Sequence, residues 1–250
     1  MERHRPSALI TGASRGLGRA LAHRLAAAGS RVVLVARHAA ALEEVAAELR
    51  ERGLEAHAIA ADVADEDAAH HIAGQAAALV GPIDLLVHNA SILGPTPLRL
   101  LLDTDCEDLA AVLEANLVGP FRLTKAVAGS MVLRGHGTIV HVSSDAAVSA
   151  YPRWGAYGVS KAAHDHLLRI LAAELAGTGV RVLAIDPGEM DTAMHRDADP
   201  DADPASLARP EDVASRIVAI LGDPARAPSG SRVLADEWRA AAGPTREIAS

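Results

Sequence analysis

A tyrosine and a lysine stand four positions apart in a chain that contains two tyrosines and two lysines. In the run Tyr157-Gly158-Val159-Ser160-Lys161, a helix would place the phenol and the ammonium group on one face. A free tyrosine has a pKa of about 10, and a neighbouring cation favours the phenolate and lowers that pKa. Tyr157 and Lys161 are therefore predicted to form a general acid/base pair. Ser144, which directly follows a predicted strand, carries a hydroxyl that can hold a carbonyl oxygen, with a strand-end cap as the alternative.

A glycine-rich turn near the start of the chain has the form of a phosphate-binding turn. It follows one predicted strand, opens a predicted helix and reads Thr11-Gly12-Ala13-Ser14-Arg15-Gly16-Leu17-Gly18. Glycines permit a tight turn and the close approach of phosphate oxygens, while the start of a helix offers free N–H groups. The turn predicts a pyrophosphate site, and a structural turn without a ligand is the alternative.

The end of the second predicted strand indicates which dinucleotide the turn would hold. An NAD site has an acidic residue there for the ribose 2′-hydroxyl, whereas this chain has Val35-Ala36-Arg37. Arg15 and Arg37 could converge on a 2′-phosphate through forked, charge-assisted hydrogen bonds. The pattern predicts NADP(H) as the cofactor, and two ordinary surface arginines are the alternative.

Two further strand ends carry groups suited to the same ligand. Asp62-Val63 follows the third predicted strand, and His88-Asn89-Ala90-Ser91 follows the fourth. In open parallel sheets, ligands bind beyond the carboxyl ends of the strands. Asp62, Val63, Asn89 and Ala90 are therefore predicted to line the adenine or ribose part of the cofactor site.

Short apolar runs alternate with longer stretches of helical period, which is typical of repeated βα units. The predicted strands span residues 7–11, 31–36, 55–61, 83–88, 137–143, 180–185 and 232–235. The predicted helices span residues 17–29, 39–52, 66–80, 104–134, 156–176 and 210–221. Right-handed crossovers join such strands into an α/β fold with a Rossmann-like, doubly wound sheet. We expect one domain over residues 1–250.

The composition argues against several classes of function. A net charge of -8 without a Lys/Arg-rich run disfavours binding to nucleic acid or to an anionic membrane surface. One cysteine, Cys106, cannot form an internal disulfide and fits a reducing compartment. The short, charged N-terminus is unlike a signal peptide, and no stretch approaches the roughly 18 apolar residues of a membrane span. We expect a cytoplasmic protein with a small-molecule substrate, no nucleic-acid partner and no membrane contact.

Residues 195–208 form a biased segment in which Ala-Asp-Pro recurs. Its aspartates resemble a calcium loop, but Ala202 and Ala208 stand where such a loop needs Gly and Glu. The pairs His70-His71 and His164-Asp165-His166 have spacings that do not face one ion. We therefore expect no metal, and a solvated, mobile flap of about residues 189–209 over the crevice.

The substrate end of the crevice is less well specified. An apolar wall could be formed by Leu93, Tyr151, Trp154, Met190 and Met194, with ordinary core packing as the alternative. Asp145 and Glu189 stand beside the proposed catalytic residues and could select a polar or cationic substrate. The alternative is that they belong to the solvated rim of the crevice. The residues do not identify the substrate.

Over nearly the whole chain, these motifs and their order resemble the short-chain dehydrogenase/reductase family. The resemblance implies seven mostly parallel strands in the order 3-2-1-4-5-6-7, with helices on both faces. It implies that Tyr157 exchanges the hydroxyl proton, that Lys161 lowers the tyrosine pKa and binds the nicotinamide ribose, and that Ser144 positions the carbonyl. Asn116 would hold a proton-relay water. The segment that would cover the nicotinamide supplies four cofactor contacts: Pro187, Gly188, Met190 and Thr192.

The resemblance also implies an activity and an assembly. Hydride would pass between the nicotinamide and a carbonyl or secondary alcohol, and NADP preference favours a ketoreductase. The alternatives are an alcohol or sugar dehydrogenase working in the oxidative direction, and an NADPH-binding regulatory protein without turnover. Ser91 stands where the family has Gly, and residues 234–238 lack its Val-Asp-Gly-Gly ending, which puts the usual terminal subunit contact in doubt. The long helices around Asn116 and Tyr157 imply a homodimer or homotetramer.

Overall fold

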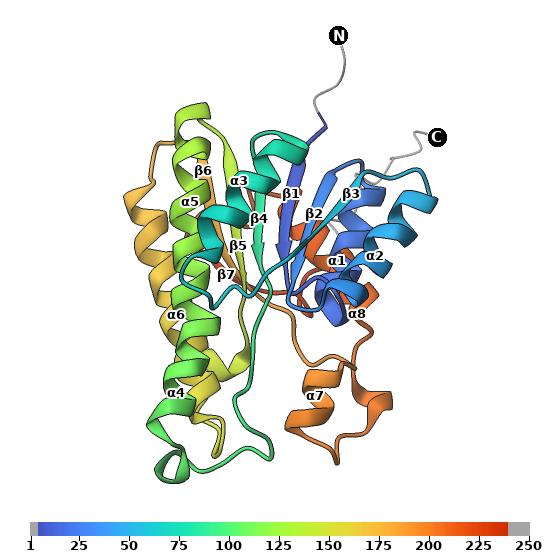
Figure 1. The fold of residues 1–250 in the computed structure, drawn as a ribbon. Helices are drawn as coiled ribbons and strands as arrows, with labels where there is room; N and C mark the ends of the chain where they lie inside the picture. Colours follow the sequence, from blue (N-terminus) through green and yellow to red (C-terminus); the bar gives the residue numbers. More distant parts are fainter. Residues whose placement is uncertain (1–4, 240–250) are drawn as a thin grey trace, which may run out of the picture.

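Seven parallel strands form the centre of the molecule (Figure 1). The computed structural model describes residues 5–239, and its strands follow the order β3-β2-β1-β4-β5-β6-β7 with every neighbouring pair parallel. Their bounds are β1 Ser7–Thr11, β2 Arg31–Ala36, β3 Ala56–Ala60, β4 Leu85–His88, β5 Gly137–Val142, β6 Val180–Asp186 and β7 Arg232–Leu234. The predicted Rossmann-like sheet and its strand order are confirmed.

Alternate residues of the central strands face two layers of helices. In β1, Leu9 packs into one apolar cluster while Ala8 and Ile10 pack into the other, because successive side chains of a strand point to opposite faces. Both faces are buried, which is why these strands read as continuous apolar runs. One face is covered by α1 (Gly16–Ala27), α2 (Ala39–Glu51) and α8 (Pro210–Leu221), and the other by α3 (Ala68–Val80), α5 (Gly119–Arg134) and α6 (Gly155–Glu174) (Figure 1).

The prediction of one continuous helix over residues 104–134 is wrong. The structure has α4 (Cys106–Leu113), then a π-helical turn (Glu114–Val118), then α5. Pro120 has no N–H to donate to the carbonyl of Asn116 one turn earlier, so the regular helical ladder is interrupted there. That carbonyl instead accepts a hydrogen bond from Nδ1 of His164 on α6, at 2.9 Å. The interruption therefore links the α4–α5 layer to the helix that carries Tyr157 and Lys161.

The segment predicted as a flap contains helical structure. Within it, α7 spans Ala193–Ala198, a 3-10 turn spans Pro204–Ser206, and Met190 pairs with Ala208 as an isolated parallel bridge. The hydroxyl of Thr192 accepts a hydrogen bond from the N–H of His195 at 3.2 Å and so caps α7. The bridge between Met190 and Ala208 thus joins the two ends of the segment beside the crevice. The mobility of the segment stays a prediction.

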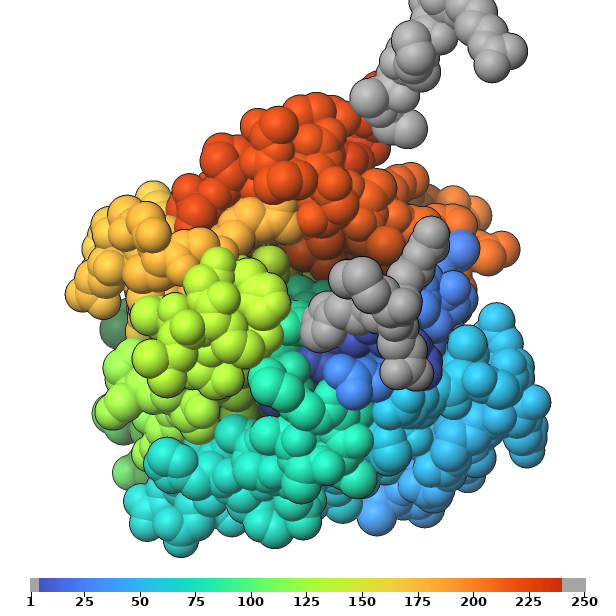
Figure 2. All heavy atoms as spheres, turned by 90° about the horizontal axis from the view of Figure 1, so that it is seen from above, coloured from blue at the N-terminus to red at the C-terminus, as the bar shows by residue number. Residues whose placement is uncertain are grey.

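The two ends of the sheet differ. Figure 2 faces the end at which the strands begin, where segments of both helical layers pack together. The strands run toward the opposite end, where α4 and α7 lie (Figure 1). Among residues 5–239, no helix is long and apolar enough to cross a bilayer.

Candidate active site

A crevice of about 1720 Å³ lies where the strands end. Nearly all the residues that the sequence predicts for the site line it. They are Gly12, Ser14, Arg15, Gly16, Leu17, Arg37, Asp62, Val63, Asn89, Ala90, Ser144, Tyr157, Lys161, Pro187, Gly188, Met190 and Thr192. Two predicted residues, Gly18 and Asn116, do not line the crevice.

The start of α1 offers an anion site. Gly16 and Leu17 line the crevice, and Arg15 in front of them makes no side-chain cap to the helix. The first N–H groups of a helix have no intrahelical partner, so these groups suit phosphate oxygens. Gly18 serves packing, since a Cβ there would lie 2.2 Å from the carbonyl oxygen of Gly12.

Asn89 joins the glycine-rich turn to the end of β4. Its side-chain Nδ2 donates to the carbonyl oxygens of Thr11 at 2.9 Å and Gly12 at 3.1 Å. The hydroxyl of Thr11 in turn accepts from the N–H groups of Asn89 and Ala90, both at 3.1 Å. Gly12 has φ +67°, and a Cβ there would lie 2.8 Å from Cα of Ala90. These contacts make a rigid floor for the crevice between β1 and β4.

The end of β2 provides positive charge. Arg15 and Arg37 both line this part of the crevice, and Ala36 contributes no carboxylate. The side chain of Arg37 is 56% exposed and forms only a long ion pair with Asp62, in which Nη1 lies 3.9 Å from the carboxylate. The guanidinium of Arg37 is therefore available to a ligand, as a nucleotide phosphate would require.

The predicted catalytic side chains meet at the other end of the crevice. Tyr157 and Lys161 lie on the first turns of α6, where both are buried. Nζ of Lys161 lies 5.4 Å from the centre of the Tyr157 ring and donates to the carbonyl oxygen of Val142 at 2.7 Å. The Ser144 hydroxyl follows β5, donates to Asp145 at 3.0 Å and accepts from the N–H of Ala146 at 3.2 Å.

Burial dominates the proton affinity of Tyr157. It raises the pKa of the phenol well above its ordinary value, and the carboxylates of Asp186 and Asp145 raise it further. Interactions with the hydroxyls of Ser144 and Ser91 offset part of this shift. That Lys161 lowers the tyrosine pKa stays a prediction; in this structure burial is the largest influence on the phenol. The phenol of Tyr157 is therefore protonated at neutral pH.

Lys161 has the opposite shift. Burial lowers its pKa to about 8, although the carboxylates of Asp165 and Asp186 favour the charged form. An ammonium group with this pKa can lose and regain a proton near neutral pH, which suits a group that exchanges protons.

Asn116 occupies the π-helical turn behind the catalytic residues. Its Oδ1 accepts from the N–H of Ile92 at 2.8 Å, and its Nδ2 donates to the Ile92 carbonyl and to the Ser160 hydroxyl, both at 2.9 Å. These bonds position the segment after β4 against α6. The relay-water role of Asn116 stays a prediction.

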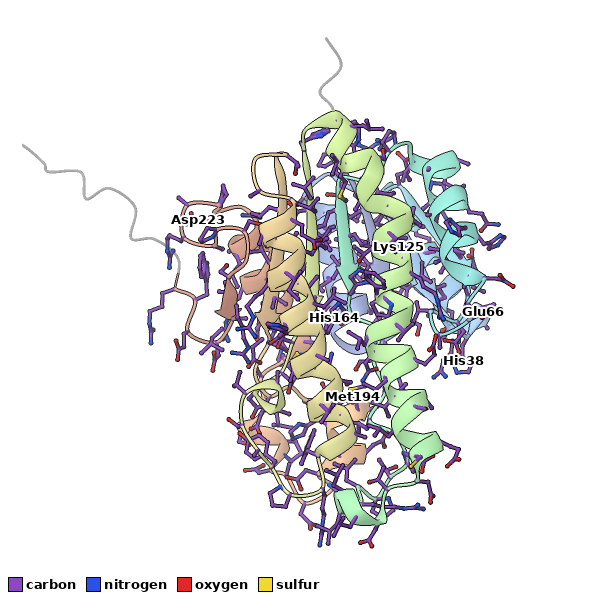
Figure 3. All side chains as sticks on the ribbon, turned by 90° about the vertical axis from the view of Figure 1, so that its left-hand side faces the viewer. His38, Glu66, Lys125, His164, Met194 and Asp223 are labelled. Carbon is purple, nitrogen blue, oxygen red and sulfur yellow. The ribbon has the colours of Figure 1, made fainter. Side chains whose placement is uncertain are left out.

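The apolar wall forms in part. Leu93 packs with Tyr157 and Ala146, and partly buried neighbours complete the cluster: Leu98, Trp154, Met194 and Ala198. Met190 instead packs against the larger core cluster, and the hydroxyl of Tyr151 donates to Asp145 at 2.8 Å. Figure 3 shows Met194 near the end of the molecule that carries the crevice.

Three buried histidines lie behind Lys161. His88 and His141 pair across β4 and β5, and the ring of His141 stacks on that of His164 at 3.7 Å between centres. Figure 3 shows His164 partway along α6. Burial lowers the pKa of all three well below the usual range, so the rings are neutral. Within residues 5–239, no three His, Cys, Asp or Glu side chains are arranged to hold a metal.

Three polar residues in and beside the crevice were not predicted from the sequence: Asp165, Asp186 and Arg232. Asp165 follows Lys161 by one helical turn and Asp186 directly precedes Pro187, so their positions in the sequence were a visible signal. Arg232, which binds both carboxylates, lies on β7 and had no such signal.

Comparisons with known proteins agree with this geometry. Residues 6–203 match the family model described as short chain dehydrogenase. The chain is 39% identical over 226 residues to a 3-oxoacyl-[acyl-carrier-protein] reductase of Synechocystis, covering 88% of this chain and 90% of that protein.

Solved structures show the same fold. One is a short chain dehydrogenase from Shigella flexneri complexed with NADP, with a TM-score of 0.86 and 29% identity over 92% of this chain and 97% of the other. Another is an NAD+-bound xylitol dehydrogenase, with a TM-score of 0.82 and 29% identity over 94% and 98% of the two chains. The sheet order, the crevice and the sequence match lead to one conclusion: the chain belongs to the short-chain dehydrogenase family.

Proposed function

We propose that this protein is an NADP(H)-dependent ketoreductase that converts a carbonyl compound to a secondary alcohol. The observation that carries the proposal is that Ser144, Tyr157 and Lys161 all line the crevice, with the phenol and the ammonium group buried on the first turns of α6. A protonated donor suits carbonyl reduction, in which the substrate oxygen gains a proton. The family resemblance alone leaves the direction open.

The crevice fits a dinucleotide phosphate. The uncapped start of α1 would hold the pyrophosphate, and Arg15 and Arg37 would hold a 2′-phosphate. Pro187, Gly188 and Thr192 would border the nicotinamide. When bound, the nicotinamide supplies the hydride. Since solved relatives hold NADP in one case and NAD+ in another, the NADP(H) preference depends on this chain's own arginines.

The chain's own groups provide the proton chemistry. Ser144 would turn from Asp145 to donate a hydrogen bond to the substrate carbonyl, which places the oxygen beside the phenol. Tyr157 then gives its proton to that oxygen. The nearby Lys161 ammonium stabilises the phenolate that is left. Asn116 donates to the Ser160 hydroxyl on α6 and so helps to keep that helix in place.

The substrate should present an apolar face to the wall around Leu93, Trp154 and Met194. A reductase of keto intermediates therefore fits better than a sugar dehydrogenase, whose substrate would need many hydrogen-bond partners. An NADPH-binding regulatory protein is disfavoured because Ser144, Tyr157 and Lys161 all line the crevice.

The proposal is tested with a panel of ketones and aldehydes and with both NADPH and NADH. We expect NADPH oxidation with at least one apolar ketone. Tyr157→Phe should lower the rate at least about 10²-fold, since a general acid contributes roughly 10²–10⁴-fold, while NADPH binding persists. Full turnover in Tyr157→Phe would contradict the proposed acid.

Assembly and compartment belong to the same proposal. Exposed apolar side chains on α5 and α6, namely Phe121, Leu133, Val159 and Ile170, suit a contact between two copies of the chain. Light scattering should therefore show a homodimer or homotetramer. A cytoplasmic location suits a chain whose single cysteine, Cys106, is free and exposed.

A further inference from the structure

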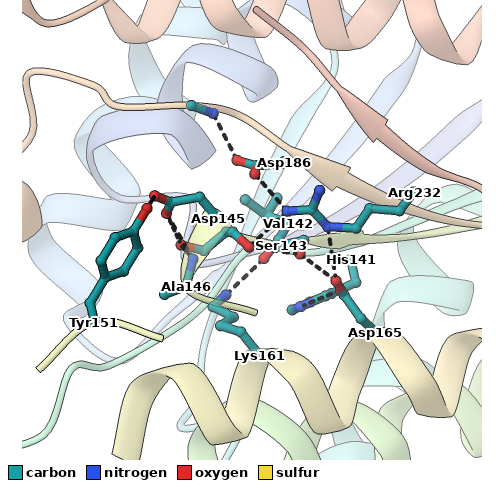
Figure 4. Close-up of polar contacts among 12 residues, drawn as sticks. His141, Val142, Ser143, Asp145, Ala146, Tyr151, Lys161, Asp165, Asp186 and Arg232 are labelled. Atoms are coloured by element: carbon teal, nitrogen blue, oxygen red, sulfur yellow. Dashed lines mark hydrogen bonds and ion pairs between the residues drawn. The ribbon is translucent and has the colours of Figure 1, made fainter. Parts of the chain in front are cut away.

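Arg232 reaches from β7 into the layer behind the catalytic residues (Figure 4). Its Nη2 donates to the carbonyl oxygen of Ser144 at 2.8 Å and to Oδ2 of Asp186 at 2.6 Å. Its Nε donates to Oδ2 of Asp165 at 3.2 Å. The Arg232 side chain is 23% exposed and each carboxylate 6%. One guanidinium therefore joins β7, the end of β5, the end of β6 and α6.

The contacts of Arg232 continue to the crevice on two sides. Asp186 uses its other oxygen to accept from the N–H of Gly188 at 2.9 Å, in the turn that would border the nicotinamide. Asp165 accepts from the hydroxyl of Ser143 at 2.7 Å, next to the catalytic serine. Arg232 itself does not line the crevice. Arg232 can therefore affect the crevice only through the residues that it binds, which are Ser144, Asp165 and Asp186.

Charged and titratable groups surround Lys161. They are Tyr157, His164 and Asp165 on α6, His141 on β5, Asp186 on β6 and, beside Tyr157, Asp145. Arg232 on β7 contacts the two nearest carboxylates. The histidines are neutral, and Asp145 is engaged by Ser144 and Tyr151. Two buried carboxylates therefore attract the ammonium group, and Arg232 pairs with both.

We propose that Arg232 is a positioning residue for the reaction, which holds the Ser144 backbone against the Asp186–Gly188 turn and balances the two carboxylates that face Lys161. This inference depends on the proposed function for its catalytic consequence, and its electrostatic part can be measured without turnover. Two consequences follow from the geometry. Loss of the guanidinium frees the Ser144 carbonyl from β7, and it leaves Asp165 and Asp186 without their shared cation.

Replacing Arg232 by Gln keeps a polar side chain but removes the charge and the fork. We expect kcat to fall roughly 10- to 100-fold, because small displacements of catalytic groups cost up to about 10²-fold. The KM for the carbonyl substrate should change little, since Arg232 does not line the crevice. Removing a positive charge raises the pKa of every group nearby, so Lys161 should titrate roughly 0.5 to 1 pH unit higher.

The titration of Lys161 can be followed directly because the chain has only two lysines. With 13Cε-labelled lysine, the unmodified protein gives one NMR signal for exposed Lys125 and one for Lys161, assigned with Lys125→Arg. Arg181→Gln is the matched control: Arg181 also ties the sheet to backbone carbonyls, those of Leu221 and Ala227, and lies at the opposite end of β6. Arg232→Lys keeps the charge and loses the fork.

The expected result has four parts. Arg232→Gln lowers kcat and raises the pH at which Lys161 titrates. Arg232→Lys restores this titration point more fully than it restores kcat. Arg181→Gln changes neither quantity, and all three variants still bind NADPH. An unshifted Lys161 signal with an unchanged kcat in folded Arg232→Gln would overturn the inference, as would equal effects in Arg181→Gln. If the unmodified protein reduced no carbonyl, the proposed function and the catalytic role of Arg232 would both fail, while the lysine signal would still decide the electrostatic part.

Discussion

Replacing Lys161 by methionine should make the protein more stable while abolishing turnover. The folded protein holds the lysine pKa at about 8, against an ordinary value of 10.5, chiefly through burial. At about 1.36 kcal/mol per pKa unit, the buried charge destabilises the fold by about 3 kcal/mol at neutral pH. Methionine removes that cost and has a similar shape. It leaves the carbonyl of Val142 without its donor, which costs about 1 to 2 kcal/mol, so we expect a net gain of about 1 to 2 kcal/mol.

The pH dependence separates this cause from ordinary repacking. Between the folded and unfolded pKa values of Lys161, the unfolded chain binds more protons than the folded one, so the stability of the unmodified protein rises with pH across that window. Lys161→Met lacks this rise. The stability advantage of the variant should therefore shrink by about 2 kcal/mol between about pH 7 and about pH 9.5.

The assay is urea unfolding of the unmodified protein, Lys161→Met and Lys125→Met at both pH values. Lys125 is the matched control, because it is the other lysine of the chain and is exposed on α5. Lys125→Met should show no pH-dependent difference in this window. A constant difference between Lys161→Met and the unmodified protein at both pH values would refute the assigned burial cost.

Three further variants test other parts of the structure. Arg37→Ala should weaken NADPH binding about 10-fold or more while changing NADH binding little, because a charge-assisted bond to phosphate contributes about 1.5 to 3 kcal/mol. Fluorescence titration measures the affinity for both cofactors, and equal weakening of the two would remove the 2′-phosphate assignment. Asn116→Ala should lower the free energy of unfolding by about 2 to 4 kcal/mol, since it deletes three hydrogen bonds. A loss below about 0.5 kcal/mol in urea unfolding would contradict the structural role of these bonds. Gly119→Ala should lower the melting temperature, because its Cβ would lie 2.0 Å from the Val63 carbonyl oxygen; an unchanged melting temperature would disagree with that contact.

Local patterns account for the parts of the structure that could be predicted. Strands β1 and β2 have the predicted bounds, because uninterrupted apolar runs between a glycine and polar residues leave little choice of limits. The spacing of Tyr157 and Lys161 likewise placed both on one helix face, beside the crevice. These features depend on neighbours in the sequence.

The features that escaped prediction depend on distant partners. The break before α5 follows from Pro120, yet it is stabilised by His164, which lies on another helix. The raised pKa of Tyr157 comes chiefly from burial by the surrounding elements. Arg232 meets Asp165 and Asp186 only after β7 joins the sheet beside β6. Spacing along the chain does not predict such contacts, although Asp165 and Asp186 each stand close in sequence to a predicted site residue.

In the reaction proposed for this chain, hydride passes from a nicotinamide to a carbonyl carbon while Tyr157 supplies the proton. The most direct test incubates the protein with NADPH deuterated at C4 on either face and a ketone that it reduces, and locates the deuterium by mass spectrometry. We expect deuterium on the carbinol carbon of the alcohol from one face of the cofactor only, and almost none with Tyr157→Phe. Alcohol without deuterium from either cofactor, or undiminished transfer in the variant, would contradict it.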